Sequence, residues 1–271
     1  MPKVSVIMTA YDGVHAHELA EAVDSILSQT LRDFEFLIMK DGIERDDLLR
    51  YLNDLAQRDA RVKLFANSKR SGIAYSLNRL VERSSGRFLA RMDADDISLP
   101  ERLEKQVAHL EEHPATFMIG SFAQEIDQTG KVLYEKQLPT DFQSVRRFMS
   151  RRDPFIHPTV MFRREFFDQL GLYNERPEFS YLEDTELWSR AILSGLECSN
   201  LPLVLFLFRI NQSFIGRRRG WRFTFYELSL RLKYCWKAGL PLPYLALPFA
   251  VGLVRLSPSA VTRFAYKQLR R

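Results

Sequence analysis

The stretch Arg91-Met92-Asp93-Ala94-Asp95-Asp96 brings three carboxylates together within six residues. It follows the apolar run Phe88-Leu89-Ala90, which is typical of a buried strand. Ser98 and Glu101 have the spacing of a capping box, and Pro100 is tolerated in a first helical turn, so a helix should begin here. The three aspartates are therefore predicted to lie on a short loop between a strand and a helix.

This acidic loop has two interpretations. Like charges this close raise one another's pKa unless a positive group neutralises them. A divalent cation that carries phosphate oxygens would do so, because Mg²⁺ and Mn²⁺ prefer carboxylate oxygens and share their shell with substrate phosphates. In α/β proteins, loops at the carboxyl ends of strands are where ligands bind. The alternative is that the aspartates only cap a helix and solvate a loop.

The composition is that of an ordinary globular protein. The chain has 271 residues, of which 46% are hydrophobic and 27% charged, enough for one large domain or one domain with an appendage. Its two cysteines, Cys198 and Cys235, lack metal-type spacing, which favours buried thiols in a reducing cytosolic compartment. The N-terminus runs directly into a strand-like segment at 4–8, so no signal peptide is expected.

In the first hundred residues, strand-like runs alternate with segments of helical periodicity. This alternation predicts a doubly wound, mostly parallel sheet, whose right-handed crossovers place all strand carboxyl ends on one edge. No strand is followed by a dinucleotide fingerprint or a P-loop, so a nucleotide would be held by carboxylates and a metal. Strands are expected at 4–8, 34–39, 62–65 and 87–92, and helices at 19–27, 46–57 and 73–84.

After the helix expected at 99–112, the pattern changes to a mixture of antiparallel strands and helices. This half is interpreted as an acceptor-side subdomain built onto the same sheet. Strands are expected at 117–122, 132–134, 157–162 and 201–208, and helices at 141–150, 163–170 and 183–194.

The C-terminal part is basic and aromatic. It contains Arg217-Arg218-Arg219 and Arg222, a helical pattern at 221–237, and an apolar run at 238–256 that three prolines interrupt. A basic end is suited to anionic lipid or nucleic acid, but no nucleic-acid-reading motif accompanies it, so nucleic acid is not expected. The run is marginal for a membrane span, which leaves an interfacial segment or a helix pair packed on the domain.

Taken together, these stretches resemble the family 2 glycosyltransferases, which are inverting, sugar-nucleotide-dependent enzymes of the GT-A fold. The resemblance covers roughly Lys3 to Arg209 in the family's order and spacing. Its main pieces are Val4–Tyr11, Ser25–Thr30, Phe34–Ile38 with Asp41-Gly42, Asn67 with Gly72–Ala74, Asp93–Asp96, Pro100–Leu103 with Gln106, His157–Met161, and Glu183-Asp184 with Leu187-Trp188 and Arg190.

The resemblance implies a Rossmann-like GT-A α/β fold, with a mixed, mostly parallel sheet flanked by helices and followed by a basic helical extension. The implied division places a catalytic domain at 1–215, with a nucleotide-binding half at 1–112 and an acceptor-side half at 113–215. Residues 216–271 would form the C-terminal extension, which would contact the membrane surface or pack on the domain.

The resemblance also implies site residues. Asp95 with Asp93 would bind Mn²⁺ or Mg²⁺, and Asp184 would be the general base with Glu183 beside it, although both acids could simply favour the start of a helix. The residues implied to contact the nucleotide are Thr9, Ala10, Tyr11, Asp12, Asp41, Asn67, Arg70, Asp93 and Ala94.

Three residues depart from the family pattern near the expected base pocket. Lys40 stands where a second acid is common, Ile43 replaces the usual serine, and Asp12 replaces asparagine. These changes leave the identity of the donor nucleotide undecided, and UDP is the default expectation.

The sequence thus predicts a metal-dependent glycosyltransferase that moves a sugar from a UDP-sugar to a glycan or lipid-linked acceptor in surface polysaccharide biosynthesis. It would work in the cytoplasm, peripherally at the inner face of the cytoplasmic membrane. Two alternatives stay open: a nucleotidyltransferase that makes sugar nucleotides, and a non-catalytic sugar-nucleotide or lipid-binding module.

Overall fold

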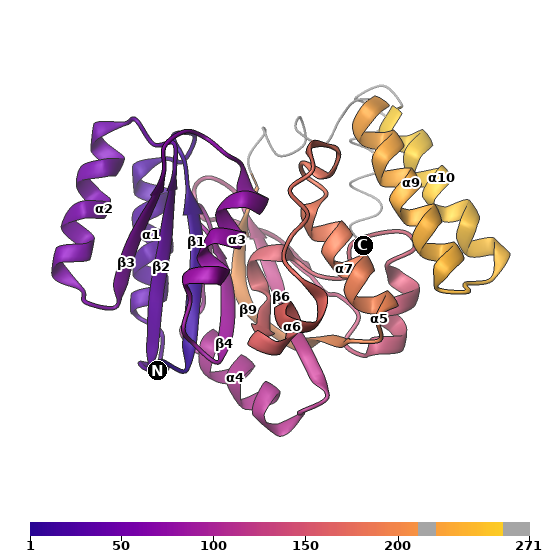
Figure 1. Cartoon of the computed structure of the whole chain (residues 1–271), viewed down its shortest axis with the longest axis horizontal. Helices are drawn as coiled ribbons and strands as arrows, with labels where there is room; N and C mark the ends of the chain where they lie inside the picture. The colour runs from indigo at the N-terminus through magenta and orange to yellow at the C-terminus, as the bar shows by residue number, and fades with distance from the viewer. Residues whose placement is uncertain (211–220, 257–271) are drawn as a thin grey trace.

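The computed structural model describes residues 1–210 and 221–256. Its centre is a nine-stranded sheet in the order β3-β2-β1-β4-β8-β6-β9-β5, with β7 paired to β6 (Figure 1). Four neighbouring strands of the first half are parallel, and helices connect them as expected. In chain order these elements are β1 (Val4–Ala10), α1 (Ala16–Leu27), β2 (Phe34–Asp41), α2 (Asp46–Arg58), β3 (Val62–Asn67), α3 (Ile73–Arg83) and β4 (Phe88–Asp93).

The second half extends the same sheet with mixed pairings. β8 is antiparallel to both β4 and β6, while β6 and β9 are parallel. The expected hairpin joins β6 to β7. The elements are β5 (Ile97–Ser98), α4 (Arg102–Glu112), β6 (Thr116–Ile126), β7 (Val132–Lys136), α5 (Phe142–Phe148), η1 (His157–Thr159), β8 (Met161–Arg163), α6 (Arg164–Leu170), η2 (Pro177–Phe179), α7 (Glu183–Leu193), β9 (Glu197–Arg209), α9 (Trp221–Lys237) and α10 (Leu242–Leu256).

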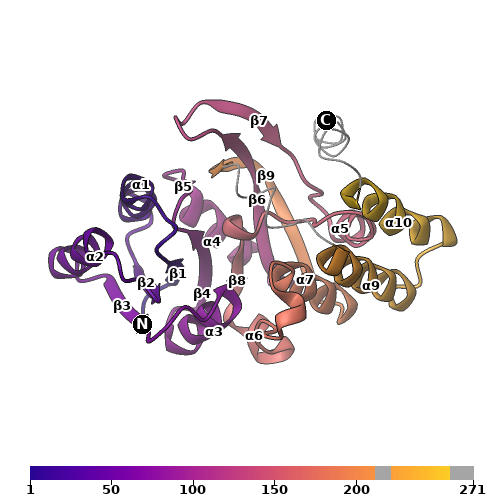
Figure 2. The ribbon, with the colours of Figure 1, turned by 90° about the horizontal axis from the view of Figure 1, so that it is seen from above.

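Helices cover both faces of the sheet, as the view from above shows (Figure 2). Successive side chains of a strand point to opposite faces. On β1, Val6 and Met8 therefore belong to the apolar cluster that includes residues of α1, α2 and α4, while Ile7 belongs to the cluster on the other face with residues of α3, α6 and α7. The two apolar layers hold the sheet between them and fix where its carboxyl-end edge lies.

The prediction of a capping box at the start of α4 is wrong. The helix begins at Arg102, and its N-cap residue Glu101 makes no side-chain capping hydrogen bond. Ser98 lies in β5 instead, where its hydroxyl accepts a hydrogen bond from Gln29 Nε2 at 3.2 Å. Gln29 Oε1 also accepts from the Leu103 amide at 3.0 Å, so a side chain remote in sequence satisfies a donor at this helix end.

The strand expected at 157–162 is also partly wrong. His157–Thr159 form a turn of 3₁₀ helix, and β8 begins only at Met161. Pro158 has no N–H to give to a ladder, and the Thr159 hydroxyl donates to the Ile156 carbonyl at 2.8 Å, which closes the turn.

The C-terminal helices α9 and α10 form a pair that packs on the core, which is one of the two arrangements expected from the sequence (Figure 1). Tyr234 and Cys235 of α9 are fully buried among residues of α5 and α7. No helix within the described residues is long and apolar enough to cross a membrane. The arginines at 217–219 lie outside the described residues.

Candidate active site

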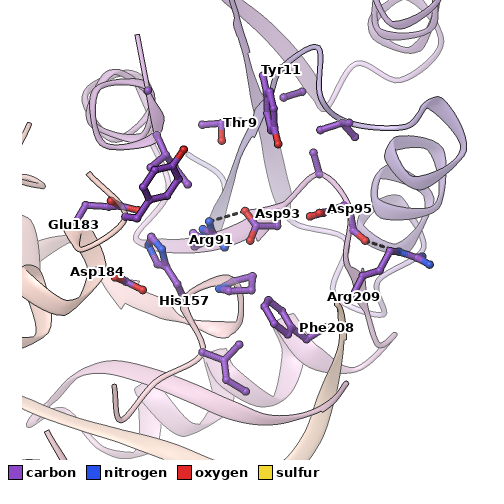
Figure 3. Close-up of a pocket in the computed structure, with 18 of the residues that line it drawn as sticks. Thr9, Tyr11, Arg91, Asp93, Asp95, His157, Glu183, Asp184, Phe208 and Arg209 are labelled. Atoms are coloured by element: carbon purple, nitrogen blue, oxygen red, sulfur yellow. Dashed lines mark hydrogen bonds and ion pairs between the residues drawn. The ribbon is translucent and has the colours of Figure 1, made fainter. Parts of the chain in front are cut away.

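A pocket with a volume of about 470 Å³ lies at the carboxyl ends of β1, β2 and β4 (Figure 3). The opposite wall comes from η1, the start of α7 and the end of β9. The structure brings ten of the twelve residues implied by the resemblance to this pocket. They are Thr9, Ala10, Tyr11, Asp41, Arg70, Asp93, Ala94, Asp95, Glu183 and Asp184.

Tyr11 and Arg70 form one wall of the pocket. The Arg70 guanidinium lies over the Tyr11 ring, 4.6 Å from its centroid. A flat cation stacked on an aromatic ring offers both π contact and charge to a nucleotide. This pair therefore has the chemistry that a base and its phosphates require.

Asp41 is held at the end of β2 by the loop before α3. Its carboxylate accepts hydrogen bonds from the Ser71 amide at 2.8 Å and the Gly72 amide at 3.0 Å. Gly42 has φ +65°, and a Cβ there would lie 2.3 Å from the Arg70 amide nitrogen. The close approach that only glycine permits thus brings the Arg70 loop against the end of β2.

Asp12 and Asn67 do not line the pocket. Asp12 accepts hydrogen bonds from the amides of Glu44 and Arg45 at 3.0 and 3.1 Å, which secures the loop after β2. Asn67 donates to Asp41 Oδ1 at 2.8 Å and so orients that carboxylate. A direct contact of either residue with a nucleotide stays a prediction.

The acidic loop follows β4 as expected from the sequence. Carboxylate oxygens of Asp93, Asp95 and Asp96 all lie within 4.8 Å of one another. Burial, together with the charges of Asp93 and Glu18, raises the pKa of Asp95 to about 7. Burial and the two neighbouring aspartates also raise the pKa of Asp96 well above its usual value. Burial and like charge thus both favour the protonated forms of these carboxyl groups, and a bound cation would offset this.

Arg91 is the buried cation that accompanies this loop. Its side chain is 3% exposed, and Nη2 lies 2.5 Å from Asp93 Oδ1. Burial alone would lower the pKa of Arg91, but the charge of Asp93 raises it, so the guanidinium is positive. Its Nε and Nη1 atoms are buried without a hydrogen-bond partner. A buried cation beside the acidic loop makes this wall of the pocket positive, which favours an anionic ligand.

Arg209, at the end of β9, fixes the far side of the acidic loop. Its amide donates to Asp96 Oδ1 at 2.7 Å, and its Nε donates to the Asp95 carbonyl at 2.8 Å. Nη2 also pairs with Glu21 at 2.6 Å. The sequence carries no signal for this role, because the contact depends on the pairing of β9 with β5 and β6.

On the acceptor side, the first turn of α7 presents Glu183 and Asp184 to the pocket, and both are buried. Asp184 Oδ1 accepts from the Thr185 amide at 2.7 Å. The Thr185 hydroxyl donates to Asp153 Oδ1 at 2.8 Å, and that same oxygen accepts from Arg231 Nη2 of α9 at 3.0 Å. A chain of contacts therefore connects the C-terminal helix to the neighbourhood of Asp184.

His157 lies in the pocket wall between the acidic loop and Asp184 (Figure 3). Its Nε2 is 2.9 Å from the hydroxyl of buried Tyr173, and its ring lies edge-on to Trp188. The proline that follows and this contact orient the ring. The sequence resemblance gives His157 no role of its own, so its place in the pocket wall comes from the structure.

Comparison with known proteins identifies a family. The profile described as glycosyl transferase family 2 matches residues 5–171. Over 268 residues the chain is 31% identical to the amylovoran biosynthesis glycosyltransferase AmsE of Erwinia amylovora, an alignment that covers 98% of this chain and 99% of that protein. It is 26% identical over 275 residues to the UDP-Gal:alpha-D-GlcNAc-diphosphoundecaprenol beta-1,3-galactosyltransferase of Escherichia coli, with coverage of 99% and 96%.

Solved structures confirm the GT-A fold. TarS of S. aureus, residues 1–349 in complex with UDP, superposes with a TM-score of 0.68 at 19% identity, covering 98% of this chain and 75% of that one. The mannosyltransferase PcManGT of Pyrobaculum calidifontis, in complex with GDP-Man and Mn²⁺, gives a TM-score of 0.61 at 19% identity, with coverage of 99% and 80%.

Proposed function

The chain belongs to glycosyl transferase family 2, and we propose that it is an inverting, metal-dependent enzyme that transfers a sugar from a nucleoside diphosphate to an acceptor hydroxyl. The observation that carries the proposal is one pocket with the acidic loop of β4 on one wall and Asp184 on the other (Figure 3). A donor and an acceptor can therefore meet between a phosphate-binding end and a proton-accepting end.

The donor we propose is a UDP-sugar. The stacked pair of Tyr11 and Arg70, with Asp41 beside it, supplies π surface, positive charge and a hydrogen-bond acceptor for the base and ribose. UDP is the nucleotide of the E. coli relative and of the TarS complex, whereas PcManGT is in complex with GDP-Man. Lys40, the departure from the family pattern, has Nζ 3.5 Å from Asn53 Oδ1 of α2 and does not line the pocket.

The acidic loop fits Mn²⁺ or Mg²⁺. Its donors are carboxylate oxygens close to one another, and the buried Oδ2 of Asp96 has no hydrogen-bond partner. We assign Asp95 and Asp93 as the residues that would hold the ion. When bound, such an ion offsets negative charge on the leaving nucleoside diphosphate. The PcManGT complex contains Mn²⁺ together with its sugar nucleotide, which supports this choice of ion.

Protein groups supply the rest of the proposed reaction. Asp184 accepts the proton of the acceptor hydroxyl as its oxygen attacks the anomeric carbon, and attack opposite the leaving group inverts that centre. Glu183 lies beside Asp184 at the same helix start, and the Arg91 guanidinium, paired with Asp93 in the pocket wall, contributes positive charge toward the phosphoryl oxygens.

The acceptor we propose is a surface glycan or its lipid-linked precursor. The relatives support this choice, since their names refer to amylovoran biosynthesis and to a sugar on diphosphoundecaprenol. We further propose a peripheral position at the inner face of the cytoplasmic membrane. The helix pair supports it by exposing large apolar side chains, which are Trp221, Phe225, Trp236, Leu242 and Phe249.

The test of the proposal is the Asp184→Asn variant, which keeps the shape of the side chain and removes its basicity. We expect turnover to fall by roughly 10²–10⁴-fold while Mn²⁺-dependent binding of UDP is unchanged. Calorimetric titration of UDP and single-turnover transfer would be measured on the same preparation. Transfer at the wild-type rate would remove Asp184 from the role of general base.

A further inference from the structure

A second cavity, with a volume of about 670 Å³, lies between α5, α10 and the loop that follows β7. We call it the α5–α10 groove. The residues of its lining that matter most here are Phe122, Leu138, Arg147, Arg151, Tyr244 and Leu247. The proposed transfer reaction assigns no role to this groove.

The groove is a direct neighbour of the active-site pocket. Lys136 lines the pocket and the next residue, Gln137, lines the groove. In a second segment, Asp153 lines the pocket and Arg151 lines the groove. Because consecutive Cα atoms are about 3.8 Å apart, the two segments place residues of both cavities within about 7 Å of each other. Adjoining residues of the same two segments therefore line the groove and the pocket that contains Asp184.

The groove carries excess positive charge from the segment Arg146-Arg147-Phe148-Met149-Ser150-Arg151-Arg152. Arg147 and Arg151 are exposed, line the groove, and make no ion pair with a carboxylate in the described part of the chain. The Arg151 guanidinium lies 4.7 Å from the centroid of the Phe148 ring, which orients it. Asp141, the carboxylate of the lining, accepts from the Ser144 amide at the start of α5. Arg147 also donates to the Ser144 hydroxyl at 3.4 Å, and its charge contributes to lowering the pKa of Asp141, so the lining holds two arginines against one carboxylate and keeps a net positive charge for an anion.

The other walls of the groove are apolar. Phe122 and Leu138 come from the sheet side, and Tyr244 and Leu247 come from α10. The same helix exposes Leu242 and Phe249 at the surface. Guanidinium pairs suit phosphate oxygens, and an adjoining apolar wall suits a hydrocarbon chain.

We propose that the α5–α10 groove binds the diphosphate and the adjoining hydrocarbon of a lipid-linked acceptor, and so presents the sugar of that acceptor to the pocket. Arg147 and Arg151 bind the diphosphate, and Leu247 contacts the lipid. This inference rests on the proposed glycosyltransferase function and specifies how its acceptor is held.

The experiment measures binding of farnesyl diphosphate and of inorganic diphosphate to the whole chain, with EDTA present so that no divalent ion carries them to the acidic loop. The first variant is Arg147→Gln/Arg151→Gln. Its matched control is Arg50→Gln/Arg58→Gln, which removes the same charge from exposed positions of α2 at the other end of the molecule (Figure 1). The second variant is Leu247→Gln, which leaves both arginines in place.

The proposal predicts that the Arg147/Arg151 variant binds both diphosphates about tenfold or more weakly, while the α2 control binds like wild type. Leu247→Gln should weaken farnesyl diphosphate alone. Equal loss in the α2 control would mean that only net charge matters, and it would overturn the proposal. So would tight, arginine-dependent binding to anionic phosphatidylglycerol vesicles without any effect on farnesyl diphosphate, because the partner would then be the bilayer headgroup.

UDP titration with Mn²⁺, run on the same proteins, separates this inference from the proposed function. All variants should bind UDP equally, because none of the substituted residues lines the pocket. If wild type binds UDP but its farnesyl diphosphate binding does not depend on the groove, only the groove proposal fails. If wild type binds no sugar nucleotide, the proposed function itself fails.

Discussion

Replacing Arg231 by methionine tests the connection between α9 and the active site. Arg231 is 2% exposed, and it donates to Asp153 at 3.0 Å, to Glu227 at 3.1 Å and to the Met149 carbonyl at 2.8 Å. Burial alone would lower the pKa of Arg231, but the charges of Asp153 and Glu227 raise it, so the side chain is a buried cation. Methionine keeps much of the aliphatic stem and removes every donor.

The expected loss of stability follows from the partners that lose this cation. Breaking a buried pair by removing one member typically costs about 3–5 kcal/mol, since the remaining charge is left without compensation. For a chain of this size each kcal/mol lowers the melting temperature by roughly 2–4 °C, so a decrease of roughly 6–20 °C is expected. Adding Glu227→Met should restore part of this loss, because the double variant no longer buries Glu227 without Arg231.

The assay is thermal and urea unfolding of wild type, Arg231→Met and the double variant, followed by kinetics at a temperature where all are folded. Because Asp153 also holds the Thr185 hydroxyl next to Asp184, we expect a lower kcat with unchanged UDP binding. A loss below about 1 kcal/mol in the single variant would mean that Arg231 does not compensate the buried charges of Asp153 and Glu227. Unchanged kcat would refute the proposed connection to the base.

Three further predictions concern other parts of the molecule. Burial would raise the pKa of Glu35, but hydrogen bonds from Lys63 and two serines outweigh it and lower this pKa to about 2. The ionised carboxylate therefore stabilises the folded protein fully above about pH 4.5, and this contribution is lost as the pH falls toward 2. Urea titrations should therefore show Glu35→Gln less stable than wild type by on the order of 2 kcal/mol at neutral pH, with a gap that narrows below about pH 4.5; a constant gap would contradict this. Gly42→Ala should weaken UDP binding severalfold, because the added Cβ would displace the Arg70 loop. The control is Gly130→Ala, since Gly130 also has a positive φ but a Cβ there would meet no atom within 4 Å, so UDP affinity should not change. Equal UDP affinities of the two variants in calorimetry would contradict a role for the close approach at Gly42. Trp236→Ser with Leu242→Ser should reduce co-sedimentation with anionic vesicles without changing UDP binding, and undiminished sedimentation would exclude this face as the membrane contact.

The sequence predicts the architecture well where local patterns determine it. Alternation of strand and helix periodicity in the first hundred residues predicts a mostly parallel sheet with its carboxyl ends on one edge, and the structure has it, in the order β3-β2-β1-β4. Sequence prediction fails where a distant residue supplies a hydrogen bond, as Gln29 does for the Leu103 amide at the start of α4 in place of the expected capping box. It also fails where the backbone limits of Pro158 and the Thr159 hydroxyl form a 3₁₀ turn at the start of an expected strand.

The same distinction applies to the candidate site. Four of the predicted residues lie at the carboxyl end of a strand or just after it, and ligands bind at that edge of an α/β sheet, so the sequence alone places them together; they are Tyr11, Asp41, Asp93 and Asp95. Arg91 does leave a signal, since a charged residue within an apolar strand requires a partner. Other contributors reach the site through tertiary contacts alone and have no local signature; they are Arg209, Asp153 and Lys136.

The expected division of the chain at residue 215 stays a prediction. The structure adds that α9 buries Tyr234 and Cys235 among residues of α5 and α7. Deletion of everything beyond about Gly216 would therefore expose core residues as well as remove the proposed membrane contact. Point substitutions on the exposed face of the helix pair separate these two effects.

Calorimetric titration of UDP-, GDP-, dTDP- and CMP-sugars into the protein, with and without Mn²⁺, tests both the donor and the acidic loop. We expect Mn²⁺-dependent binding of one nucleotide class, UDP foremost, that Asp95→Ala abolishes and that Arg50→Gln leaves intact. Binding that ignores both Mn²⁺ and Asp95→Ala would contradict the proposed role of the acidic loop. Absence of binding by every sugar nucleotide would contradict the proposed function and favour a module without catalytic activity.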